Sequence, residues 1–258
     1  MKKNSNASIQ MIADVDGDIR TLYNEGDDGN MPFLVTRNMV MFPGVVAPLM
    51  IGRKQSIQLI DMLRANPNQI IAIFCQKREA DETPAARDIY DWGVFARLIR
   101  TIDIPENNNV TAIFQGLGRC RREDLRQVDP FYGGYAYKQL EQRPSTADEK
   151  KRYKTAVAEL REVVSEYIHK SDEMPNESEF AIKNITNDTM LVNFVCSNAM
   201  LAVPEKIQLL KIDNMMERVM ALLKCLHRDI QFMELRHEIR IKTREDLDEQ
   251  QREYFLQQ

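Results

Sequence analysis

The sequence predicts an α+β protein in which a strand-rich half is followed by a helical bundle and then by one long extended helix. Three observations support this prediction. Between residues 32 and 142, short apolar runs rich in β-branched residues alternate with proline and glycine turns. Between residues 143 and 212, apolar residues recur at helical spacing behind capping residues. From residue 213, the apolar positions follow a heptad spacing.

The strand-rich half, residues 32–142, is predicted to form about six strands and one helix. The expected elements are a helix over 56–65 and strands over 70–75, 94–102, 110–114 and 131–140. The turn sequence PENNN at 105–109 indicates a long hairpin between two of these strands. Gly116 and Gly118 then suggest a sharp corner. Together these features predict a curled sheet or pseudo-barrel.

The most apolar stretch of this half is residues 32–53, PFLVTRNMVMFPGVVAPLMIGR. Its prolines cannot donate to a strand ladder, so it is predicted to form a strand, a proline-bounded loop and a second strand. An exposed apolar loop marks a contact site for another protein, and methionine adapts to varied partners. The candidate substrate-contact residues are Met39, Met41, Phe42 and Pro43. The alternative, which composition alone favours, is a core strand with a tight turn.

The helical half is predicted to begin after residue 144. Thr146 with Glu149 forms a capping box for a helix that extends to about residue 170. Later helix starts are marked by Asn176 with Glu179, by Asp188, and by Pro204 in a first turn. Residues 143–212 are therefore expected to form a bundle.

The last helix is predicted over residues 213–258. Its apolar seam, expected to pack on the bundle or on neighbouring subunits, consists of Met216, Val219, Leu223, Leu226, Ile230 and Met233. The seam fails at His237 and Arg240, and residues 240–253 are almost entirely polar. A helix that is polar all round bridges solvent, so we expect a lever that leads to a further module. The alternative is a helix that folds back on the bundle.

Bulk composition narrows the class of protein. A hydrophobic content of 43% and a charged content of 29% are typical of a soluble globular protein. The net charge of −4 argues against a dedicated nucleic-acid binder. Residues 1–31 carry three basic and six acidic residues with little periodicity, which predicts a mobile acidic tail. No apolar run reaches the ~20 residues that span a bilayer, so no membrane partner is expected.

The cysteines favour a cytoplasmic location. Four cysteines are far apart and form no CxxC pair, which predicts buried free thiols in a reducing compartment. They are Cys75, Cys120, Cys196 and Cys225.

No motif predicts an enzyme site, a cofactor or a metal in this chain. The sequence lacks GxxxxGK[ST], GxSxG and HExxH, and its three histidines are not at ligand spacing. One arginine cluster has residue types that suit RNA phosphates, namely Arg97, Arg100, Arg119, Arg121, Arg122 and Arg126. Neighbouring carboxylates dilute this cluster, so nucleic-acid binding is disfavoured.

A series of segments, in order, resembles the amino-terminal region of Lon-type ATP-dependent proteases. The segments are PFLVTRN, MFPGVVAPLMIGR, KQSIQLID, IIAIFCQK, IYDWGVFARLIR, VTAIFQGLGRCRREDL, and IDNMMERVMALLKCLHRDIQFMELRHEIR with EQQREYFLQQ. The resemblance covers roughly residues 32–258, although 143–204 match in helical pattern more than in residues. It implies that the strand-rich half is a barrel similar to PUA domains.

The same resemblance implies a function. In that family this region is non-catalytic, captures unfolded, damaged or tagged protein substrates, and supports a hexamer. ATP, magnesium and a serine–lysine peptidase site would belong to modules beyond Gln258. The alternative is a stand-alone Lon-domain adaptor that binds protein without a motor, which the unfinished final helix disfavours.

Overall fold

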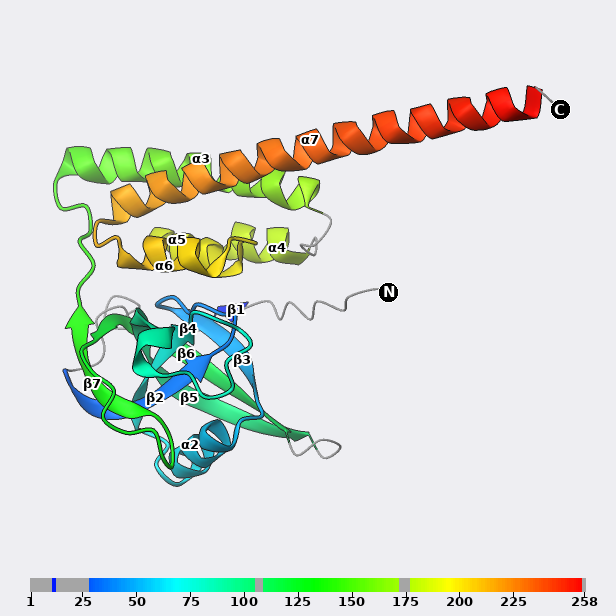
Figure 1. Cartoon of the computed structure of the whole chain (residues 1–258). Helices are drawn as coiled ribbons and strands as arrows, with labels where there is room; N and C mark the ends of the chain where they lie inside the picture. Colours follow the sequence, from blue (N-terminus) through cyan, green and yellow to red (C-terminus); the bar gives the residue numbers. More distant parts are fainter. Residues whose placement is uncertain (1–10, 13–27, 105–108, 172–176, 257–258) are drawn as a thin grey trace.

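The strands and helix α2 gather in one half of the molecule, and the other five α-helices, α3 to α7, gather in the other (Figure 1). A computed structural model describes residues 11–12, 28–104, 109–171 and 177–256. Helices α4, α5 and α6 lie between the strands and an outer layer made by α3 and α7 (Figure 1). The predicted α+β class, with a pseudo-barrel, a bundle and a long extended helix, is confirmed.

The strand half is one seven-stranded sheet that closes on itself. Its strands are β1 (Met11–Ile12), β2 (Gly29–Thr36), β3 (Val45–Ile51), β4 (Ile70–Gln76), β5 (Ile89–Ile104), β6 (Asn109–Arg122) and β7 (Gly133–Gln139). The order is β1-β3-β6-β5-β4-β2-β7, and β6 also pairs with β7. Strand β6 closes the ring because it pairs with β5 along one edge and, in its last part, with β7 along the other; its first part pairs with β3. Among these pairs only β2 with β4 is parallel.

Apolar side chains fill the barrel and also cover one side of it. The interior cluster includes Phe33 and Phe74, whose rings meet edge to face with centroids 4.9 Å apart. A larger cluster runs from helix α2 (Lys54–Ala65) through the outer strands into the helical half. The barrel and bundle therefore share one continuous apolar core.

Local signals set the helix starts of the bundle. Its helices are α3 (Ala147–Lys170), α4 (Glu177–Asn184), α5 (Asp188–Asn198), α6 (Val203–Lys211) and α7 (Met215–Leu256). The predicted capping box of Thr146 and Glu149 begins α3, and Pro204 lies in the first turn of α6. The predicted Asp188 cap is wrong by one residue, because the Asn187 side chain accepts the bond from the Met190 amide. Asn176 lies outside the described residues.

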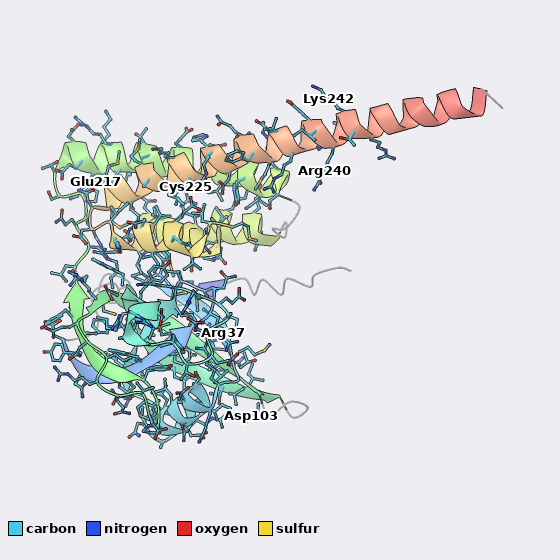
Figure 2. The ribbon with its side chains drawn as sticks, viewed as in Figure 1. Arg37, Asp103, Glu217, Cys225, Arg240 and Lys242 are labelled. Atoms are coloured by element: carbon cyan, nitrogen blue, oxygen red, sulfur yellow. The ribbon has the colours of Figure 1, made fainter. Side chains whose placement is uncertain are left out.

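Helix α7 packs along its first half and projects from the bundle along its second (Figure 1). Val219, Leu223, Leu226 and Ile230 of the predicted seam are buried, while Met216 and Met233 are half-buried against the same core. The chief partner of this seam is α3 within the same chain. Beyond Met233, the described side chains to residue 244 are exposed (Figure 2). The fold-back alternative is therefore wrong.

The predicted boundary of the amino-terminal tail differs from the structure. The predicted tail is not wholly separate, because Met11–Ile12 pairs antiparallel with Val45 and Val46, and β2 already begins at Gly29. The rest of 1–27 lies outside the described residues. In the part of the chain that the structure describes, no helix is both long and apolar enough to cross a membrane.

Candidate functional site

The predicted contact loop is buried at the junction between barrel and bundle. Met41, Phe42 and Pro43 are buried, and Phe42 has no exposed surface; Met39 is half-buried. Helix α5 covers the loop, and Asn193 Nδ2 donates to the Pro43 carbonyl at 3.2 Å. The expectation of an exposed apolar surface is therefore wrong for Met41, Phe42 and Pro43. The core alternative fits the structure.

The barrel does expose an apolar surface, but on the strands that follow this loop. We call Pro48, Met50, Ile102 and Ile113 the barrel patch. Met50 is 68% exposed and Ile102 is 45% exposed, while Pro48 and Ile113 are half-buried. The register places Met50 and Ile102 on either side of Thr111, and Pro48 beside Ile113. The four side chains therefore share one face of β3, β6 and β5.

The opposite face of the same strands packs into the larger apolar cluster. Ala47, Ala112 and Phe114 alternate with the patch residues and are fully buried. Because successive side chains on a strand point to opposite faces, burying these residues exposes Pro48, Met50 and Ile113. The sequence VVAPLMI is apolar on both faces, so its pattern did not reveal which set would be exposed.

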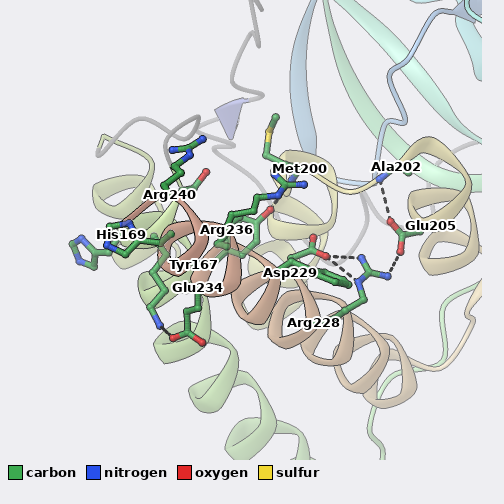
Figure 3. Close-up of a pocket in the computed structure, with 15 residues that line it drawn as sticks. Tyr167, His169, Met200, Ala202, Glu205, Arg228, Asp229, Glu234, Arg236 and Arg240 are labelled. Carbon is green, nitrogen blue, oxygen red and sulfur yellow. Dashed lines mark hydrogen bonds and ion pairs between the residues drawn. The ribbon is translucent and has the colours of Figure 1, made fainter. Parts of the chain in front are cut away.

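A second surface is a groove where α7 leaves the bundle (Figure 3). It has a volume of about 910 Å³ and is lined by the end of α3, the start of α6 and one side of α7. Met200 and Phe232 expose apolar surface there, at 41% and 55%. Arg228 bridges Glu205 and Asp229 on its rim, and hydrogen bonding to Arg228 lowers the pKa of Glu205. The lining of the groove is mixed, because Lys170, Arg236 and Arg240 line it as well as Met200 and Phe232.

The structure separates the predicted arginine cluster. Arg119 has no exposed surface and bonds to the segment that joins α6 to α7. Arg122 is also buried, where it pairs with Asp91 at 2.8 Å. Two of the six arginines are therefore structural, and the cluster forms no continuous basic face.

The described residues form no reactive or metal-binding cluster. No three His, Cys, Asp or Glu side chains among them gather where they could hold a metal ion. The four cysteines are free, as predicted; three are buried and Cys225 is half-buried. Burial raises the pKa of the Cys196 thiol to about 12, so this thiol is a poor nucleophile.

The chain thus combines a barrel that carries an exposed apolar patch with a helical bundle. The sequence model of the ATP-dependent protease La (LON) substrate-binding domain matches residues 30–228, so the chain belongs to this family. The Lon protease of Flavobacterium johnsoniae is 39% identical over 93% of this chain, and that of Parabacteroides distasonis is 36% identical over 95%. The chain spans 29% of the length of each.

Solved structures confirm the fold. The N-terminal domain of a Mycobacterium avium complex Lon protease superposes with a TM-score of 0.60. The superposition covers 77% of this chain and 98% of that domain, at 16% identity. At this identity the likeness concerns the architecture alone.

Proposed function

We propose that this chain is the non-catalytic, substrate-holding region of an ATP-dependent Lon-type protease. The barrel patch would hold unfolded, damaged or tagged proteins through their apolar segments. The observation that carries this proposal is the exposure of Met50 and Ile102 on the same face of the sheet, on either side of Thr111. Contiguous exposed apolar surface of this kind is typical of protein-binding sites.

Binding at one patch would be weak, because only a few side chains are covered. Each square ångström of apolar surface removed from water contributes about 25 cal/mol. In a hexamer, several patches would hold one unfolded chain, and effective concentration would raise the overall affinity. ATP, magnesium and the serine–lysine peptidase would act in parts of the protein beyond this chain. We expect the assembly to be cytoplasmic.

The test is binding of a reduced and alkylated, permanently unfolded protein that carries a fluorophore. We expect the double variant Met50→Lys/Ile102→Lys to bind about tenfold more weakly, a change of about 1.4 kcal/mol. The matched control is Phe180→Lys/Met220→Lys, which also replaces two exposed apolar residues, on α4 and α7. Equal affinity of the patch variant and the unaltered chain, with circular dichroism unchanged, would contradict the proposal.

The groove provides a second comparison within the same assay. If Met200→Lys/Phe232→Lys weakens binding and the patch variant does not, the groove is the binding surface instead. The protease and adaptor alternatives differ in the gene beyond the Gln258 codon. A reading frame that continues into a GxxxxGK[ST] motif supports the protease, and a nearby stop codon supports the adaptor.

A further inference from the structure

Two buried arginines hold the segment from which α7 begins. The first is Arg119 on β6, whose side chain has no exposed surface. Its Nη1 donates to the carbonyls of Leu210 at 2.7 Å and Ile212 at 3.2 Å. Its Nη2 donates to the Leu140 carbonyl and to Asp213 Oδ1, both at 2.7 Å. The last carbonyls of a helix have no amide from a following turn to bond with. The Arg119 side chain of the barrel supplies donors to the carbonyls at the end of α6.

The second arginine approaches the same segment from the helical side. Arg218, in the first turn of α7, also has no exposed surface. Its Nη2 donates to the Ile212 carbonyl at 2.7 Å, so both arginines share this acceptor. Its Nη1 donates to Glu141 Oε1 at 2.6 Å and to Asn193 Oδ1 of α5 at 2.8 Å. The Glu141 side chain is buried and lies 3.9 Å from Arg119 Nε.

Backbone bonds tie the same elements together. The linker that leaves the barrel pairs with the segment before α7, since the Gln142 amide donates to the Asp213 carbonyl at 2.9 Å. The Met215 amide returns a bond to the Gln142 carbonyl at 3.0 Å. The linker out of the barrel and the start of α7 therefore form one short two-stranded connection.

Two arginines and two carboxylates meet in this cluster. Burial and the nearby Arg218 cation lower the pKa of Arg119, while Asp213 and Glu141 raise it, and at neutral pH the guanidinium stays charged. If the barrel and α7 moved apart, buried cations would lose their carboxylates, which is strongly unfavourable. Networks of this kind have few alternative arrangements of similar energy.

We propose that Arg119, Glu141, Asp213 and Arg218 form a junction clamp that fixes the direction in which α7 leaves the barrel. When the barrel or the helical half is displaced, the clamp makes the other half move with it. Strand β6 links the clamp to the barrel patch, because it carries Ile113 in its first part and Arg119 in its last. Arg119 is the positioning residue of this joint. The geometry of the clamp does not depend on what the patch binds.

The test measures the direction of α7 in the full chain. Spin labels are placed at two exposed sites, Lys54→Cys at the start of α2 and Lys242→Cys on the projecting part of α7 (Figure 2), with Cys225→Ser. We expect Arg119→Lys to raise the population of displaced arrangements about tenfold, because lysine cannot replace the lost charge-assisted bonds. Asp213→Asn keeps a side-chain oxygen that can accept a hydrogen bond but removes the negative charge. We expect this variant to broaden the distribution of distances between the two labels less than Arg119→Lys does.

The matched control is Arg122→Lys. Arg122 is also a buried arginine on β6, but the bonds that the structure shows for it reach Ala86, Ile89 and Asp91 within the barrel half. Unchanged distances in a folded Arg119→Lys variant, or equal broadening in both lysine variants, would overturn the clamp. If Arg119→Lys fails to fold by circular dichroism, Asp213→Asn decides alone, and unchanged distances there overturn the proposal.

Discussion

Two apolar segments of the barrel, only a few residues apart, have opposite environments. The loop at Met39–Pro43 carries the more conspicuous apolar sequence, and most of it is buried. The next strand carries Met50, which is 68% exposed on the barrel patch. Composition does not distinguish them, because both are rich in methionine, valine and proline.

The two segments differ in burial because the loop is covered by a helix that lies much later in the chain. Helix α5 covers the loop, and Ser197 Oγ donates to the Val40 carbonyl at 3.4 Å. On its other side the loop lies against β6, where a Cβ on Gly116 would come within 2.4 Å of the Phe42 carbonyl oxygen. Met50 and Ile102 lie on the face of β3 and β5 that is turned away from Ala47 and Ala112, and both are exposed. Burial is thus a property of tertiary contacts.

The largest loss of stability should come from a substitution in the buried loop. We expect Phe42→Ala to lower the free energy of unfolding by about 3–5 kcal/mol, because it removes a fully buried ring and leaves a cavity. Urea unfolding measures this change. The matched exposed variant, Met50→Ala, should stay within about 0.5 kcal/mol of the unaltered chain. A loss below about 1 kcal/mol for Phe42→Ala would show that the loop is not part of the core.

The same contrast can be made within one helix. Leu226 is fully buried in the packed half of α7, whereas Leu235 is 52% exposed in the projecting half. We expect Leu226→Ala to cost about 2–5 kcal/mol, and Leu235→Ala to cost about 0.5 kcal/mol or less. Similar costs for both, in the same urea assay, would mean that the second half of α7 is also packed in solution.

Locally encoded features were predictable from the sequence. The capping box of Thr146 with Glu149 and the first-turn Pro204 specify their helix starts through contacts within one turn. The heptad seam predicted the buried face of α7 because its period is a property of the helix alone. The strand pattern with its glycine corners predicted a curled sheet or pseudo-barrel, and the resemblance between segments supplied the family.

Long-range features were not predictable. Arg119 was placed in a surface cluster, yet it is buried because its partners, Leu210 to Asp213, lie about ninety residues later. The Met11–Ile12 strand was missed because it depends on an open edge of β3. The barrel patch was missed because β3 is apolar on both faces. In each case the determining contact comes from a distant part of the chain.

The smallest expected change in stability is at an exposed helix cap, which polar hydrogen bonds stabilise. The Glu149 carboxylate accepts hydrogen bonds from the Ser145 and Thr146 amides at 2.9 and 3.1 Å, which lower its pKa to about 2. Thr146→Ala should cost about 1 kcal/mol, because the cap accepts the Glu149 amide.

The pH dependence of this cap follows from the sign of the shift. An unfolded glutamate titrates near 4.3, so the folded state binds its proton less readily than the unfolded state. The stabilisation is present above about pH 4.3 and is lost as the pH falls toward about 2. Unfolding of the unaltered chain and of Glu149→Gln, compared between pH 6 and pH 2.5, should therefore converge at low pH. Glu162→Gln, further along α3, controls for loss of one carboxylate, and identical pH profiles for the two glutamine variants would show that the capping bonds contribute nothing in solution.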